Sequence, residues 1–239
     1  MNKIKVSAVS YTNTTPFIYG IKNTSLLSNI DLSLDIPSTC AQKLIDHTVD
    51  VGLVPVAALL HIPNYEIISD YCIGATGAVN SVFIFSNKPI QEIKTLRLDL
   101  QSRTSNNLAR VLLKNYWKQS VELVDSQDAD AFVEIGDKTF GKKGNYPFAY
   151  DMGEEWMNFT GLPFAFAVWA ANKHLPQEFI KEFNEAMKFG LDNRDKVIND
   201  LPKREDFDIA HYLNHSIDFM LTAEKKEAIA RFHHYIKEL

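Results

Sequence analysis

The hydroxyl-rich segment Ser102–Ser105, SRTS, has the residue types and spacing of an anion-binding turn. Leucines alternate with charged residues before it, which is typical of a strand, and apolar residues recur at helical spacing after it. The N-terminus of a helix presents unpaired backbone N–H groups and partial positive charge. Ser102, Thr104 and Ser105 therefore predict a site for a carboxylate or phosphate, although a simple helix cap would use the same residues.

Polar turns also follow other predicted strands. Ser10–Thr15 follows an apolar strand at 4–9, Pro55 follows one at 51–54, and the glycine-containing stretch Thr76–Ser81 follows another. In open α/β sheets, ligands bind beyond the carboxyl ends of the strands, so we expect these turns to share one cleft. The candidate substrate-binding residues are Ser10, Pro55, Thr76, Gly77, Ser81, Ser102, Thr104 and Ser105.

Three carboxylates lie in or next to apolar strands, where an unpaired charge would be unfavourable. Asp99 precedes the SRTS turn, Glu134 lies within a strand, and Asp151 precedes a predicted helix. Each of them has the chemistry of an acid or base, of a helix cap, or of one partner in a buried ion pair. We take Asp151 as the candidate for a catalytic role.

Several other chemistries lack their usual motifs. His211 and His215 have the spacing of a metal-binding pair, but no third ligand accompanies them. Cys40 and Cys72 lie far apart without a CxxC motif or a neighbouring base, and the chain has no GxSxG, GxGxxG or Walker motif. We therefore expect no metal and no cofactor.

The composition is that of a soluble globular protein. Of its 239 residues 46% are apolar, enough for substantial cores, and the net charge of −5 argues against a general nucleic-acid binder. The apolar runs are too short for a secretion signal or a membrane span. With two separate cysteines, we expect a cytoplasmic protein that acts on a small molecule and binds neither nucleic acid nor membrane.

Strands alternate with helices, which predicts an α/β fold with mixed, mainly parallel sheets. Two long apolar strands, Val79–Phe85 and Phe164–Ala171, are placed to carry the chain between two lobes. The predicted organisation is a first lobe of residues 1–84 and 171–239, a second lobe of residues 85–170, and a hinged cleft between them.

Six blocks of the sequence resemble the chorismate dehydratase family and together cover much of the first 170 residues. They are SYTNTTP (Ser10–Pro16), DVGLVPVAAL (Asp50–Leu59), GAVNSVFIFS (Gly77–Ser86), LDLQSRTSNNLARVLL (Leu98–Leu113), DADAFVEIGD (Asp128–Asp137) and YDMGEEWMNFTGLPFAFAVWA (Tyr150–Ala170). The resemblance implies a periplasmic-binding-protein type II fold used as an enzyme. It also implies a carbon–oxygen lyase that converts chorismate to 3-[(1-carboxyvinyl)oxy]benzoate and water in the futalosine route to menaquinone.

The resemblance also implies roles for individual residues. Ser10 and Asn13 would contact the substrate from the first lobe, with Asn13 orienting the leaving group or transition state. Donors to the substrate's carboxylates would be Ser81, Thr104 and Ser105. Asp151 would bind a hydroxyl or order the lobes. Since no protein base is evident, our hypothesis is that the substrate's own enolpyruvyl carboxylate takes the proton.

The sequence departs from the family pattern at two positions, where Ala78 replaces a proline and Asn80 replaces an arginine. Two alternatives share the implied fold. One is the enzyme that acts later in the same pathway, 1,4-dihydroxy-6-naphthoate synthase, and the other is a non-enzymatic protein that binds small anions. The SRTS turn and the GEEW block favour the dehydratase.

Overall fold

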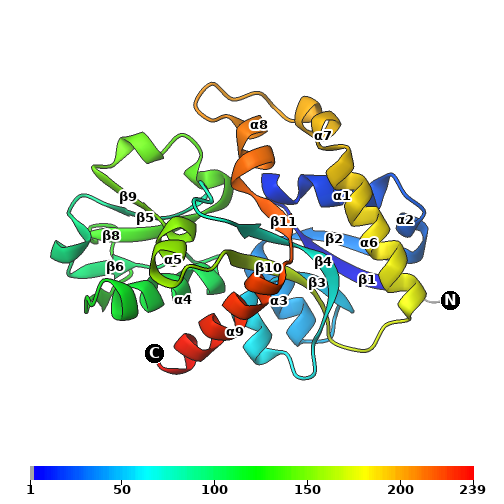
Figure 1. The fold of residues 1–239 in the computed structure, drawn as a ribbon, viewed down its shortest axis with the longest axis horizontal. Coiled ribbons are helices and arrows are strands. Elements are labelled where there is room, and N and C mark those ends of the chain that lie inside the picture. Colours follow the sequence, from blue (N-terminus) through cyan, green and yellow to red (C-terminus); the bar gives the residue numbers. More distant parts are fainter. Residues whose placement is uncertain (1–2) are drawn as a thin grey trace.

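Residues 3–239 are described by the computed structural model, and they form two mixed β-sheets covered by helices (Figure 1). The six-stranded sheet has the order β11-β4-β10-β3-β1-β2 and the five-stranded sheet the order β7-β6-β8-β5-β9. The strands of the first are β1 (Ile4–Val9), β2 (Ile30–Asp35), β3 (Val51–Pro55), β4 (Glu66–Ala75), β10 (Phe164–Ala171) and β11 (Asp218–Met220). Those of the second are β5 (Val82–Ser86), β6 (Thr95–Arg97), β7 (Glu122–Leu123), β8 (Ala131–Ile135) and β9 (Phe148–Asp151).

Each sheet is parallel on one side and antiparallel on the other. In the first sheet β1 is parallel to β2 and β3, whereas β10 is antiparallel to β3 and β4. In the second, β6 is parallel to β7 and β8, whereas β5 is antiparallel to β8 and β9. The expected mainly parallel pairing thus holds for only part of each sheet. Parallel neighbours need a crossover connection, such as the one that residues 10–29 provide between β1 and β2.

Helices cover the faces of both sheets. They are α1 (Thr15–Lys22), α2 (Leu26–Asn29), α3 (Pro37–Ile45), α4 (Arg103–Val111), α5 (Met152–Thr160), α6 (Gln177–Asp192), α7 (Arg194–Asp200), α8 (Ile209–His211) and α9 (Ala223–Lys237). Prolines lie in the first turns of α1 and α3, where their missing N–H groups leave no backbone acceptor unpaired. Within residues 3–239, none of the helices has both the length and the apolar character that a bilayer span requires.

Sheet membership moves the crossings from where we expected them. All of β5 belongs to the second sheet, so residues 82–84 do not join the first lobe, and all of β10 belongs to the first sheet, so residues 164–170 do not join the second. The chain crosses in the connections 76–81 and 161–163 instead. A buried strand needs hydrogen-bonding partners along its whole length, so it stays in one sheet and the irregular segment makes the crossing. The division into two lobes itself stays a prediction.

The C-terminal helix α9 contacts both halves of the molecule. It packs on β10 of the first sheet and on α4 beside the second, toward which it runs in Figure 1. The rings of Phe232 and Tyr235 lie 6.0 and 6.3 Å from that of Trp156 in α5. The predicted lobe assignment implied that residues 171–239 pack only on the first sheet. The contacts of α9 show that they also pack beside the second.

The close contact between α1 and α6 allows the packing of this fold to be tested by substitution. A Cβ on Gly20 would lie 1.9 Å from the carbonyl oxygen of Ala186, so Gly20→Ala must push the two helices apart. We expect this change to lower the free energy of unfolding by about 3 kcal/mol in chemical denaturation. Gly144→Ala is the control, because its Cβ would meet nothing within 4 Å. Equal stability of the two variants would contradict the packing described here.

Candidate functional site

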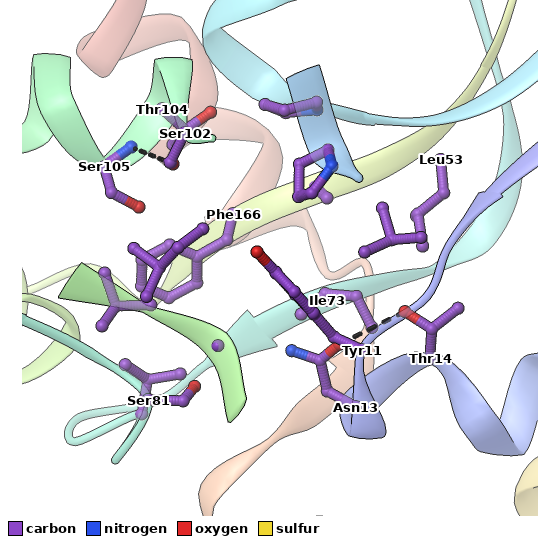
Figure 2. A pocket seen from close by; sticks show the side chains of 18 residues that line it. Tyr11, Asn13, Thr14, Leu53, Ile73, Ser81, Ser102, Thr104, Ser105 and Phe166 are labelled. Carbon is purple, nitrogen blue, oxygen red and sulfur yellow. Dashed lines mark hydrogen bonds between the residues drawn. The ribbon is translucent and has the colours of Figure 1, made fainter. Parts of the chain in front are cut away.

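A cavity of about 60 Å³ lies between the two sheets, beyond the ends of β1, β3 and β5, within a region of about 540 Å³ that includes open solvent (Figure 2). Six of the predicted site residues line it: Asn13, Pro55, Ser81, Ser102, Thr104 and Ser105. The predicted turns therefore do converge, although they lie up to 92 positions apart between Asn13 and Ser105 in the sequence (105 minus 13).

The SRTS turn acts as a helix cap and also faces the cavity. Ser102 caps α4, its Oγ accepting a 3.0 Å hydrogen bond from the backbone N–H of Ser105. Thr104 Oγ1 accepts a 3.1 Å bond from the N–H of Ala57, which belongs to the segment after β3. Figure 2 shows Ser102, Thr104 and Ser105 together on one side of the cavity. Capping and lining the cavity, which the sequence left as alternatives, occur together here.

A second polar group is formed by Asn13 and Ser81, which come from the two different halves. They are joined through the hydroxyl of Tyr212, which accepts a 3.2 Å bond from Asn13 Nδ2 and donates a 2.8 Å bond to Ser81 Oγ. Tyr212 is 1% exposed. Sequence reasoning missed it, because nothing in its local sequence indicates that it reaches two residues far away in the chain.

The remaining walls of the cavity are apolar or aromatic. Leu53, Ile73 and Phe166 line it, and Tyr11 lies across it with its hydroxyl donating a 2.7 Å bond to Gln101 Oε1 (Figure 2). Burial, with the nearby charges of Asp99 and Asp137, raises the pKa of Tyr11, so its phenol stays protonated at neutral pH. Sequence reasoning missed Tyr11 as well, although it lies inside the polar turn Ser10–Thr15.

Charged side chains are absent from the cavity walls. None of the lining residues within 3–239 is Asp, Glu, His, Lys or Arg. An anion in this cavity would be held by neutral donors, which are hydroxyl, amide and backbone N–H groups, together with the partial positive charge at the start of α4.

Hydrogen bonds connect the two halves beside the cavity. The backbone N–H and the hydroxyl of Thr12 both donate to the carboxylate of Asp137, with distances from 2.9 to 3.2 Å. Burial raises the pKa of Asp137, and the bonds from Thr12 offset part of that effect. Together with the Tyr11–Gln101 bond, these contacts hold the halves against each other.

Asp151 lies outside the cavity lining and has a structural role. Its carboxylate is 2% exposed and accepts backbone N–H bonds from Val79, Asn80, Gly153 and Glu154, at 3.0, 2.6, 3.0 and 3.3 Å. It therefore caps α5 and fixes the crossing segment before β5. Burial raises its pKa despite these four donors. Because its oxygens face backbone N–H groups, we no longer assign it a chemical step.

Asn80, which stands where the family pattern has arginine, also lies outside the cavity lining. It has a left-handed φ of 56°, and its Nδ2 donates a 3.0 Å bond to Ser216 Oγ. In this chain residue 80 ties the crossing segment to the C-terminal turn Tyr212–Ser216.

Three other predicted binding residues are not among the cavity-lining residues. Ser10 is exposed and bonds through its backbone N–H to the carbonyl of Asp35. Thr76 donates its hydroxyl to Asp218 at 2.8 Å, and Gly77 forms a turn with a φ of 93°. Position after a strand does not guarantee that a side chain points into the cleft, because a turn of several residues can face either way.

The other groups considered from the sequence have structural partners. Asp99 pairs with Lys138 at 3.2 Å and Glu134 with Lys142 at 2.8 Å. Burial raises the pKa of the Cys40 thiol to about 11 and that of Cys72 to about 12, so neither thiol is ionised at neutral pH. In the described part of the chain, no group of three or more His, Cys, Asp or Glu side chains is arranged to hold a metal ion.

The ion pair between Asp218 and Lys225 predicts how the stability of the protein depends on pH. Asp218 bonds the fully buried Lys225 at 2.7 Å, and although burial alone would raise its pKa, the bonds from Lys225 and Thr76 lower it below the usual value. A lowered pKa contributes stability above about pH 4, which is lost as the pH falls through the folded-state value.

Asp218→Asn should therefore lower the free energy of unfolding at pH 7 by about 2 kcal/mol, less than for a fully buried pair because Asp218 is 35% exposed. The difference from wild type should shrink below about pH 4, as measured by denaturant titration across pH. The exposed pair of Lys188 and Asp192 supplies the control variant Asp192→Asn, which should change stability little. A difference that grew on acidification would contradict this assignment.

Comparison with known proteins agrees with this architecture. Protein AF1704 from Archaeoglobus fulgidus matches with a TM-score of 0.76 and 16% identity, over 99% of this chain and 97% of that one. The Candida albicans CA3427 product, described as having the generic periplasmic binding protein fold, matches with a TM-score of 0.66 and 13% identity over 100% and 94%. The periplasmic aliphatic sulphonate binding protein SsuA from Escherichia coli matches with a TM-score of 0.58 and 14% identity over 100% and 92%.

These likenesses confirm the expected periplasmic-binding-protein fold. In sequence, a model of the family described as menaquinone biosynthesis matches residues 4–238, nearly the whole chain. The chain therefore belongs to the menaquinone biosynthesis family.

Proposed function

We propose that this protein is a chorismate dehydratase, a lyase that produces 3-[(1-carboxyvinyl)oxy]benzoate and water from chorismate. One observation carries the proposal. The cavity of this menaquinone biosynthesis protein combines apolar walls with a set of neutral hydrogen-bond donors. A ring with two carboxylates needs such a mixture of surfaces.

The cavity can hold the two kinds of group on chorismate in different places. The ring would lie against Phe166, Ile73 and Leu53, which form apolar wall. A carboxylate would accept bonds from Thr104 and Ser105 at the start of α4, where the helix dipole favours negative charge. This arrangement makes binding directional without any charged side chain.

The reaction breaks two bonds and forms an aromatic ring. The ring carbon bearing the enolpyruvyl ether loses its proton, and the electron pair of that C–H bond enters the ring as the neighbouring carbon loses its hydroxyl group. The hydroxyl leaves as water once it has received a proton. Because aromatisation drives this loss, the protein mainly has to orient the substrate and stabilise the departing oxygen.

We assign the stabilisation of that oxygen to Asn13 and Ser81, and in support they form the second polar group of the cavity. As the base we propose the enolpyruvyl carboxylate of the substrate itself. In support, no carboxylate, imidazole or amine lines the cavity within residues 3–239, and the phenol of Tyr11 has a raised pKa.

A non-enzymatic binding role is the second candidate, because solved structures of similar fold include binding proteins such as the sulphonate binding protein. Incubation of the purified protein with chorismate, without added cofactor, separates the candidates. Formation of the benzoate product, followed by liquid chromatography, supports the dehydratase. Binding without conversion would indicate a receptor, and neither binding nor conversion would favour the later enzyme of the pathway.

Replacement of Asn13 tests the proposed site directly. Asn13→Ala removes an amide donor from the cavity, so we expect kcat with chorismate to fall at least about 100-fold. The melting temperature should stay close to that of wild type, which differential scanning calorimetry would check. Asn29→Ala, which removes an exposed amide bonded to Glu182, is the matched control and should keep full activity. Undiminished turnover in Asn13→Ala would remove this residue from the mechanism.

A further inference from the structure

The hydroxyl of Tyr212 lies outside the cavity lining and joins the two residues of its second polar group, Asn13 and Ser81. Tyr212 is fully buried and is not a cavity-lining residue, yet its oxygen contacts two residues that are. Asn13 follows β1 of the first sheet, and Ser81 ends the crossing segment that leads into β5 of the second sheet. Tyr212 therefore has no direct access to a ligand, but it contacts the groups that do.

Tyr212 lies in the middle of a directed chain of hydrogen bonds that runs from Asn13 to Ser81. A phenol has a single proton, and Tyr212 gives it to Ser81 Oγ at 2.8 Å, so its oxygen must accept from Asn13 Nδ2 at 3.2 Å. The amide of Asn13 is thereby held with its nitrogen toward Tyr212, and its Oδ1 accepts a bond from the hydroxyl of Thr14 at 3.2 Å.

This direction leaves two protons for the cavity. Ser81 already receives a proton from Tyr212, so its own hydroxyl proton is free to point elsewhere, and Asn13 Nδ2 has a second proton. Both residues line the cavity, at the end away from Ser102, Thr104 and Ser105 in Figure 2. The Ser81 hydroxyl and the Asn13 amide are thus both able to donate a hydrogen bond to a ligand oxygen in the cavity.

The surroundings of Tyr212 hold its ring in place. It begins a π-helical turn, Tyr212–Ser216, and its ring makes edge-to-face contacts with Phe140 at 5.2 Å and Phe207 at 5.4 Å. Ser216 in the same turn accepts the bond from Asn80, next to Ser81. Such π-turns often occur at functional sites. Burial raises the pKa of Tyr212, which keeps the phenol protonated at neutral pH.

We propose that Tyr212 is a positioning residue: its hydroxyl orients Asn13 and Ser81 so that both donate hydrogen bonds to an oxygen of the bound molecule. The identity of that oxygen as the departing hydroxyl of chorismate rests on the proposed function. The orientation of the two donors does not depend on it.

Tyr212→Phe removes the hydroxyl and keeps the ring. We expect kcat/KM with chorismate to fall about 30-fold, most of it in kcat, because both donors lose their fixed orientation but remain present. Tyr150→Phe is the matched control. The hydroxyl of Tyr150 accepts a 2.8 Å bond from the backbone N–H of Ile90, and Tyr150 is not a cavity-lining residue. It should show a similar change in melting temperature and unchanged activity.

A double-mutant cycle separates positioning from a general structural effect. In a Ser81→Ala background, the further loss caused by Tyr212→Phe should be at least about fivefold smaller than in the wild type, because one of the two oriented groups is already gone. Equal losses in both backgrounds would overturn the proposal, as would wild-type activity of Tyr212→Phe.

An NMR measurement tests the orientation without any turnover. The side-chain NH₂ signals of Asn13, assigned by their absence in Asn13→Ala, should shift in Tyr212→Phe and stay in place in Tyr150→Phe. Unshifted signals would overturn the proposal whatever the activity of the protein. If wild-type protein does not convert chorismate but the signals shift as expected, the proposed reaction fails while the positioning role of Tyr212 stands.

Discussion

The buried carboxylate of Asp151 determines how the two halves of this molecule meet. It binds the backbone N–H groups of Val79 and Asn80, just before β5, and those of Gly153 and Glu154 at the start of α5. A buried charge is unfavourable unless hydrogen bonds compensate it, and here four backbone donors do so. The crossing segment is therefore held in one conformation, and Ser81, its last residue, lines the cavity.

The same segment is held from its other side by the C-terminal part of the chain. Tyr212 bonds Ser81, and Ser216 accepts a bond from Asn80. The segment thus lies between a carboxylate from the second half and a π-helical turn that precedes β11 of the first sheet. Such support from both sides fixes the position of Ser81 more narrowly than a single contact would.

Much of the fold and part of the site could be predicted from local sequence. The SRTS turn combined strand period, cap residues and helix period within a few positions, so its place at the start of α4 followed directly. The capping role of Asp151 could not be predicted, because a catalytic carboxylate and a helix cap share the same local sequence pattern. Only the positions of its four backbone donors reveal the cap. The lobe boundaries were misplaced because an apolar run shows that a strand is buried but does not show to which sheet it belongs.

Tyr212 was beyond the reach of sequence reasoning for a different reason. Its partners lie 131 and 199 positions away, and neither periodicity nor composition around Tyr212 indicates a contact over such distances. The same holds for Phe166, which an apolar strand places equally well in a core or in a cavity wall. Residues of these two kinds become visible only when the halves have been brought together.

The position of α9 has a consequence for the entry and release of ligands. This helix contacts both halves of the molecule. Two of its rings pack against Trp156 of α5, and His233 bonds the carbonyl of Val56 at 2.8 Å. Wide rotation of the halves would have to tear these contacts, whereas the Tyr11 and Thr12 contacts can part singly. Any ligand that enters by separation of the halves therefore has to compete with the packing of α9 as well as with the bonds beside the cavity.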